Sequence, residues 1–218
     1  MAHVLRFSIV FSNAGYMGIP LIEAVLGSEA AIYATVYCVS FNVFLWSLGS
    51  YIYTGNSQYI KPKKIFINPS MLAIYAALII FFLPIDGFIP SVLVSVIDML
   101  KSLVAPLSMI IVGFHMAGAD LKGLMKSGAL WCGVLTRLLL CPAVIFAVMK
   151  VVSLIGIYHN EMAATVVLIA SSTPAATATS MFAEKFSGDT ETAGAVVPIS
   201  TVLAVASMPL CALLLKLY

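Results

Sequence analysis

The chain has 218 residues, of which 62% are hydrophobic and only 9% are charged. Soluble domains carry about 25% charged residues, so this composition and a mean hydropathy of +1.09 exclude a water-soluble globule. The net charge of +2 is too small to indicate binding to nucleic acid. Because the apolar runs are continuous and do not alternate as in a membrane β-barrel, the sequence predicts an all-α integral membrane protein in a lipid bilayer.

Seven stretches approach the roughly 20 apolar residues that a helix needs to cross the hydrocarbon core. The fourth is longer than a bilayer requires and contains Asp98 and Lys101, which are spaced as an i,i+3 pair on a helix. We interpret this part as an amphipathic entry segment at the membrane surface, with a buried ion pair as the alternative. The seven stretches run over approximately 4–26, 30–54, 68–85, 91–119, 127–149, 162–183 and 192–215.

The basic residues between these spans indicate an orientation. Positive residues gather on the cytoplasmic side of membrane proteins, and here the side that holds Met1 carries most of them. We therefore expect a multi-pass protein of the cell membrane with a cytoplasmic N-terminus and Tyr218 outside. The side of Met1 holds Arg6, Lys61, Lys63, Lys64, Lys122, Lys126 and Lys185, whereas the other side holds Lys150 and Lys216.

The first span is interrupted by residues that disfavour a continuous helix. Ser12, Asn13, Gly15, Gly18 and Pro20 lie close together in its middle. Proline removes a backbone donor and clashes with the preceding turn, and glycine adds conformational freedom beside it. These residues predict two half-helices joined by unwound backbone near the midplane of the bilayer.

The sixth span contains a second interruption, at Ala170–Ser180. Apart from Pro174 its residues are small, and its hydroxyl groups include those of Ser172, Thr173 and Thr177. The two interrupted spans are five spans apart, and this odd offset inverts one relative to the other, as in secondary transporters with inverted repeats. The alternative is that the prolines are simple kinks and that the small residues serve close helix packing.

Unwound backbone at membrane depth points to a binding site. The first N–H groups of a half-helix carry roughly half a positive charge and favour anions, so a carboxylate is the natural occupant. Carbonyl ends that hold Na⁺ are the alternative, and the coupling ion, Na⁺ or H⁺, stays open. The expected substrate-binding residues are Ser12, Asn13, Gly15, Gly18, Pro20, Ser172, Thr173, Pro174 and Thr177.

Two charged residues inside the spans are further candidates. An arginine at mid-membrane costs about 2.5–3.5 kcal/mol and must face a partner or water. Arg137, in the fifth span, is therefore either a counter-charge or substrate contact, or a residue that caps backbone carbonyls or snorkels inside the bundle, and we favour the second interpretation. Glu23 lies one turn beyond Pro20 and either lines a solvated cavity or takes part in proton coupling.

Catalytic and metal-binding motifs are absent from the sequence. The four cysteines stand singly in apolar stretches, without a CxxC or a Cys/His cluster. No span contains paired aspartates, an HExxH or a Gly-x-Ser-x-Gly motif. We therefore expect a protein that is not an enzyme and that holds neither a metal ion nor another cofactor.

The two interruptions resemble those of the auxin efflux carrier family, which includes plant auxin exporters and bacterial malate or malonate permeases. Asn13-x-Gly15-x-x-Gly18-Ile19-Pro20 is similar to the first crossover of that family. Thr173-Pro174 followed by Met181–Phe186 is similar to the second. Asn68-Pro69 and the stretch from Arg137 to Pro142 are similar to its intervening helices.

This resemblance implies a fold of ten helices in two inverted repeats, of which the seven spans match the last seven. It implies transport of a small organic anion by alternating access, with residues 1–55 and 127–218 in a core domain. Residues 68–119 then belong to a scaffold that carries the contacts of a homodimer. The alternatives are a non-transporting fragment that needs additional helices, and a seven-helix receptor, which the position of Lys216 at the very end of the last span disfavours.

Overall fold

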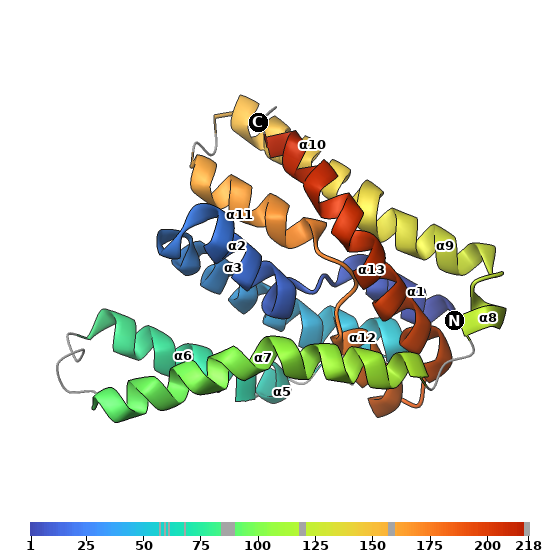
Figure 1. Cartoon of the computed structure of the whole chain (residues 1–218), viewed down its shortest axis with the longest axis horizontal. Coiled ribbons are helices and arrows are strands. Elements are labelled where there is room, and N and C mark those ends of the chain that lie inside the picture. Colours follow the sequence, from blue (N-terminus) through green and yellow to red (C-terminus); the bar gives the residue numbers. More distant parts are fainter. Residues whose placement is uncertain are drawn as a thin grey trace.

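The computed structural model of the chain is a bundle of helices (Figure 1). It describes residues 1–56, 58, 60, 62–67, 69–83, 90–117, 121–156 and 160–215. Within these residues every regular element is a helix, and one isolated antiparallel bridge joins Ser12 to Ala175. The prediction of an all-α protein is confirmed. Lys61, Asn68 and Lys216, which entered the predictions above, lie outside the described residues.

The first predicted span consists of two helices. Helix α1 (Ala2–Val10) ends in extended backbone at Phe11, and the chain resumes as a π-helical turn, η1 (Ala14–Gly18), which continues into α2 (Ile19–Leu26). The break is therefore shorter than predicted, because the backbone from Gly18 to Pro20 is helical. Pro20 lies in the first turn of α2, directly after η1, where its fixed φ fits the helix.

The sixth predicted span is also divided. Helix α11 (Glu161–Ser172) ends where Thr173 adopts an extended conformation, and α12 (Ala178–Lys185) begins after Thr177. A residue that precedes proline disfavours the α region because its backbone meets the proline ring. Pro174 therefore accounts for the end of α11. The centre of the predicted interruption is confirmed, whereas its two ends belong to helices.

The remaining elements include two long rods, each of which contains a π-helical turn. The first consists of α3 (Ala31–Phe44), η3 (Leu45–Gly49) and α4 (Ser50–Thr54), and it follows the short η2 (Ser28–Ala30). The second consists of α9 (Gly128–Leu135), η6 (Thr136–Leu140) and α10 (Cys141–Leu154). The others are α5 (Pro62–Phe66), α6 (Pro69–Phe82), α7 (Ser91–Ala117), α8 (Leu121–Leu124) and α13 (Thr190–Leu215).

Three helical segments among the described residues are long and apolar enough to cross a membrane: Ser28–Thr54, Gly128–Leu154 and Thr190–Cys211. Ala14–Leu26 and Glu161–Ser172 are apolar but shorter, because the two breaks divide the spans to which they belong. A membrane protein is thus supported by the length and composition of its helices. The full set of seven spans stays a prediction.

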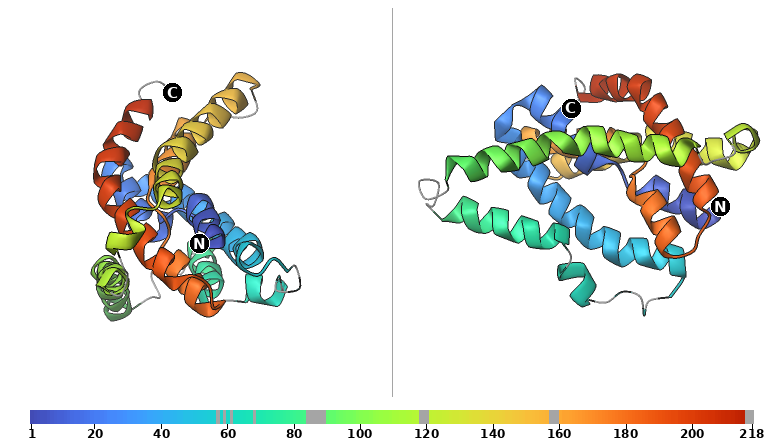
Figure 2. Two further views of the ribbon diagram at one scale, coloured as in Figure 1. Left: turned by 90° about the vertical axis from the view of Figure 1, so that its right-hand side faces the viewer. Right: turned by 60° about the horizontal axis from the view of Figure 1, so that its bottom comes forward.

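Helices α6 and α7 lie in the lower part of the bundle in Figure 1, and α7 lies at the lower edge of the left view of Figure 2. Helix α7 contacts η1 and α13, and α6 contacts α3. Both helices fall within the predicted scaffold, residues 68–119. The movement of this scaffold relative to a core of residues 1–55 and 127–218 stays a prediction.

A cluster of aromatic rings packs α1, α4 and α12 together. The rings of Phe7 and Phe182 are fully buried, and their centroids lie 4.9 Å apart. Phe11 and Tyr53 lie 4.6 Å and 5.0 Å from Phe7. The Tyr53 hydroxyl donates to the carbonyl of Thr179 at 2.8 Å, so the half-buried phenol has a partner for its polar end. The cluster holds α12, the half-helix after the second break, against the start of the chain.

The glycine at position 49 has a specific role beside this cluster. A Cβ atom added to Gly49 would lie 2.8 Å from Cε2 of Phe7 and 3.3 Å from Cε2 of Phe11, and both rings are buried. We expect Gly49→Ala to lower the free energy of unfolding by about 1–3 kcal/mol through overpacking, measured as a lower Tm of the purified protein in detergent. Gly113→Ala is the matched control, because nothing described lies within 4 Å of its added Cβ. Equal Tm values for the two variants would contradict this packing.

Candidate binding site at the helix crossing

The two breaks meet each other in the middle of the bundle. The N–H group of Asn13 donates to the carbonyl of Pro174 at 2.8 Å, and the N–H group of Ala176 donates to the carbonyl of Phe11 at 3.0 Å. These two bonds form the antiparallel bridge between Ser12 and Ala175. The unwound segments therefore satisfy each other's backbone groups, which membrane-embedded backbone requires. We call this region the crossing, defined as residues 11–13 and 173–176.

Four helix ends converge on the crossing. Helices α1 and α11 reach it with their C-termini, and η1 and α12 leave it with their N-termini. The last carbonyls of a helix carry a partial negative charge, and its first N–H groups carry a partial positive charge. The crossing thus brings two ends of each sign close to one another.

Arg137 caps the two carbonyl ends. Its Nη1 donates to Ile9 at 2.9 Å, its Nε donates to Thr173 at 3.1 Å, and its Nη2 donates to Ser171, in each case at the backbone carbonyl. The side chain is only 3% exposed. Its positive charge therefore lies at the negative ends of α1 and α11. These bonds show the capping role that we favoured from the sequence, while a direct contact of Arg137 with a substrate stays a prediction.

The π-helical turn η6 positions Arg137, and it shares a local cause with η1. Each of these turns is followed by a proline near the start of the next helix, Pro142 after η6 and Pro20 after η1. A proline deprives the carbonyl four residues before it of its usual donor and distorts the preceding turn. The carbonyl of Leu138, which Pro142 leaves without that donor, instead lies 3.8 Å from Sγ of Cys211. Such wide turns frequently occur at functional sites.

Asn13 provides a hydrogen-bond donor that the protein does not use. Its side chain is 2% exposed, and its Nδ2 atom has no partner among the described residues. Its backbone carbonyl accepts from Met17 and Gly18, so Asn13 precedes the first turn of η1. An unsatisfied buried donor costs about 1–3 kcal/mol and calls for an explanation such as a missing ligand. Asn13 thus places an amide donor beside the first N–H groups of η1.

The hydroxyl groups at the second break are engaged differently. Ser172 donates to Ile169 and Thr173 donates to Ala170, both at 2.8 Å to backbone carbonyls. Both side chains are buried, as is Ser12, whose Oγ lies 3.4 Å from the hydroxyl oxygen of Tyr37. The hydroxyl hydrogens of Ser172 and Thr173 are thus already donated to carbonyls of α11. The two hydroxyl groups can offer only oxygen acceptors to a ligand, and these do not suit the anion that we expected them to orient. Thr177 is half-buried at the start of α12.

The predicted glycines differ in their surroundings. Gly18 is buried, and a Cβ atom there would lie 3.5 Å from Cγ2 of Thr173, at ordinary contact distance from the second break. Gly15 is exposed, and nothing described lies within 4 Å of its Cβ position. The space beside the N-terminus of η1 is therefore open.

A cavity of about 590 Å³ adjoins the crossing between α2, α11 and α13. Pro20 and Ser172, two of the predicted site residues, are part of its lining, which is otherwise mostly apolar and includes Met17, Leu168 and Met208. Pockets of this size take small organic molecules. The cavity gives such a molecule room next to the helix ends.

Comparison with known proteins decides the family. The model of the membrane transport protein family matches residues 54–212, well over half of the chain. The chain belongs to this family. It is the auxin efflux carrier-like family that the motifs of the two breaks resemble. The second break and Arg137 lie within the matched residues of this membrane transport protein, and the first break precedes them.

The chain is also similar to an uncharacterized transporter of Methanothermobacter thermautotrophicus. The two proteins are 23% identical over 214 residues, which is 97% of this chain and 67% of that protein. No solved structure matches the chain. The family match and the similarity to this transporter both support a transport protein of the membrane, and neither names a substrate.

Two features of this membrane transport protein were missed from its sequence. Ser200 of α13 is fully buried at the second break, where its Oγ accepts from the N–H group of Ala175 at 3.2 Å. A serine beside Thr201 in an otherwise apolar stretch gives no signal of such a role. Glu23 does not lie at the crossing but pairs with Lys101, for which we had considered Asp98 as partner. Spacing along one helix suggested Asp98, whereas packing between two helices brings Glu23 to Lys101.

Proposed function

We propose that this membrane transport protein is a secondary transporter that moves small organic anions, in particular carboxylates, by alternating access. Family membership supports transport, and the cavity beside the crossing supports a small organic molecule. One observation favours an anion: Arg137 binds the carbonyl ends, while the Nδ2 donor of Asn13 has no partner among the described residues.

The charges at the crossing do not cancel. The two carbonyl ends together carry roughly one negative charge, which the guanidinium of Arg137 offsets. The N-terminal ends of η1 and α12 keep roughly half a positive charge each, and no carboxylate lies within the crossing itself. A carboxylate therefore finds a positive environment and an amide donor. Na⁺ is disfavoured here, because the carbonyl oxygens that it needs already accept from Arg137.

The proposed movement takes place between two parts of the chain. Residues 1–55 and 127–218, which contain both breaks, form the core, and residues 68–119 form the scaffold and the contacts of a homodimer. Helix α7 contacts both η1 and α13, so the two parts meet next to the crossing. We place the N-terminus in the cytoplasm and the C-terminus outside, with H⁺ or Na⁺ as the coupling ion.

Exchange in liposomes tests this function. The purified full chain is reconstituted, the liposomes are loaded with one carboxylate, and uptake of labelled malate, malonate or indole-acetate is followed. We expect uptake above that of protein-free liposomes, competition by other carboxylates, and no uptake of labelled choline, a cation of similar size. A folded, monodisperse protein that exchanges none of these anions would contradict the proposal and favour the non-transporting fragment.

A further inference from the structure

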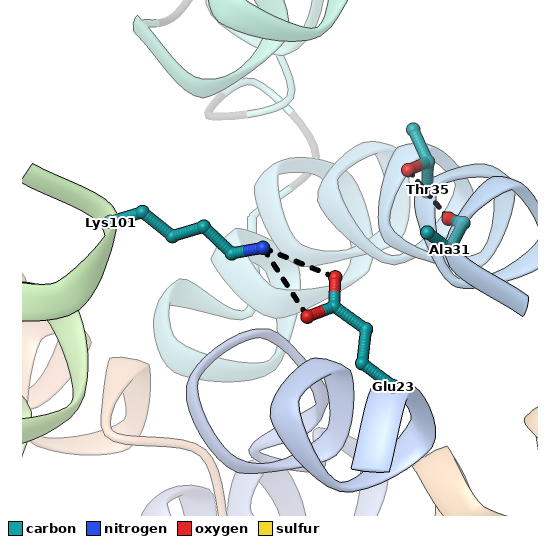
Figure 3. Close-up of polar contacts among 4 residues, drawn as sticks. All are labelled: Glu23, Ala31, Thr35 and Lys101. Carbon is teal, nitrogen blue, oxygen red and sulfur yellow. Dashed lines mark hydrogen bonds and ion pairs between the residues drawn. The ribbon is translucent and has the colours of Figure 1, made fainter. Parts of the chain in front are cut away.

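An ion pair connects α2 to α7. The Nζ atom of Lys101 lies 3.3 Å from both carboxylate oxygens of Glu23 (Figure 3). The Glu23 side chain is 31% exposed and that of Lys101 is 64% exposed. Glu23 lies in the half-helix after the first break, between Leu21 and Ala24 of the cavity lining. The pair therefore joins α2, which forms part of the cavity wall, to α7.

The two charges lie beside apolar side chains. The neighbours of Lys101 on α7 include Ile97 and Leu100, which are large apolar residues that are more than half exposed in the chain. Two opposite charges attract each other more strongly near apolar groups than in water alone. Separation of Glu23 from Lys101 is thus unfavourable unless another carboxylate replaces Glu23.

Asp98 supplies that other carboxylate. It lies three residues before Lys101 on α7, the spacing at which side chains of one helix meet. It is exposed and belongs to the same helix as Lys101, so its distance from Lys101 does not change when α2 moves. Lys101 therefore pairs with Glu23 on α2 in this conformation, and Asp98 lies within reach on its own helix. The two carboxylates give the ammonium group a partner in either position of α2.

We infer that the Glu23–Lys101 ion pair holds α2 against α7 in the conformation seen here, and that Lys101 passes to Asp98 when the core moves. The inference rests on the proposed function, because it assigns the pair to the two positions of an alternating-access cycle. The pair acts as a positioning contact between core and scaffold and does not bind the substrate.

The separation of α2 and α7 tests this inference. The four native cysteines are replaced, and spin labels are placed at Val25 and Ile97, which are 58% and 53% exposed. The distance between the labels is then measured by electron paramagnetic resonance in the full chain. Since an exposed pair contributes up to about 1 kcal/mol, we expect Glu23→Gln to raise the ratio of separated to close forms roughly five-fold. Lys101→Gln removes the partner of both positions and shifts the ratio less. In the exchanged pair, Glu23→Lys with Lys101→Glu, the ratio returns to the original value or falls below it, because Asp98 no longer attracts residue 101.

Two control variants are available. Glu29→Gln removes an exposed carboxylate of η2 outside the pair and leaves the distances unchanged, whereas Asp98→Asn removes the second partner and favours the close form. An unchanged ratio in Glu23→Gln would overturn the inference. If the cysteine-free protein does not fold, the rate of anion exchange in the native-cysteine protein is measured instead. This rate must then differ from that of the original protein in Glu23→Gln and must not show the same change in the exchanged pair.

The two proposals fail separately. Anion exchange by the unsubstituted protein together with an unchanged distance ratio in Glu23→Gln would leave the transport function and remove the role of the ion pair. A shifted distance ratio without any anion exchange would keep the role of the pair and remove the substrate class.

Discussion

Replacement of Arg137 by methionine is expected to lower the free energy of unfolding by roughly 3–5 kcal/mol. This is the range found when one partner of a buried charged interaction is removed. Methionine keeps part of the apolar stem but donates no hydrogen bond. The carbonyls of Ile9, Ser171 and Thr173 would then lose their common donor at the centre of the bundle. Each unsatisfied buried group costs about 1–3 kcal/mol, and a backbone carbonyl cannot be removed by a compensating substitution.

The measurement is the Tm of the detergent-purified protein, followed by the monodisperse fraction that survives heating. For a chain of this length 1 kcal/mol corresponds to about 2–4 °C, so we expect a fall in Tm on the order of 10 °C. The Tm of Arg137→Lys should lie between those of the unsubstituted protein and Arg137→Met. The ammonium group of lysine lacks the planar fork that reaches three separate carbonyls. Arg6→Met, at an exposed position of α1, is the matched control and keeps its Tm. A Tm of Arg137→Met equal to that of the control would show that these carbonyls have other partners.

The sequence was informative where local chemistry decides the backbone. Pro174 and its small neighbours predicted the second break, and the end of α11 at Ser172 follows from the proline that comes two residues later. At the first break the same reasoning located the interruption but placed it too late. The extended backbone begins at Phe11, a residue without any breaking tendency, because hydrogen bonds from Asn13 and Ala176 to the opposite segment fix the conformation there.

The partners of the charged residues depended on the tertiary structure. The energetic cost of Arg137 predicted that a partner exists, but not that carbonyls from two half-helices far along the chain would share the guanidinium. Lys101 shows the same limit, because spacing along α7 pointed to Asp98 and packing supplies Glu23. Hydropathy likewise identified the apolar stretches but not the lengths of the helices within them. In the structure the breaks leave the shorter helical segments Ala14–Leu26 and Glu161–Ser172.

Substitution of Asn13 is expected to have the largest effect on the binding of an anion. A hydrogen bond to a charged group contributes about 1.5–3 kcal/mol, so loss of the free Nδ2 donor in Asn13→Ala should weaken carboxylate binding roughly 10- to 100-fold. Asn13→Asp has nearly the same shape but replaces the donor by a negative charge, and we expect it to abolish measurable binding. Binding is measured by competition with a labelled carboxylate in the exchange assay or by calorimetry in detergent.

Stability separates this role from simple packing. Because Nδ2 of Asn13 has no partner among the described residues, its removal in Asn13→Ala should leave the Tm unchanged or raise it while binding is lost. Asn42 offers the matched control, since its Nδ2 already donates to the carbonyl of Cys38 at 2.9 Å. Asn42→Ala should therefore lower the Tm slightly and leave anion binding intact. If Asn13→Ala instead lowered the Tm and kept full affinity, the amide would be a structural group, and the anion site would have to lie away from the crossing.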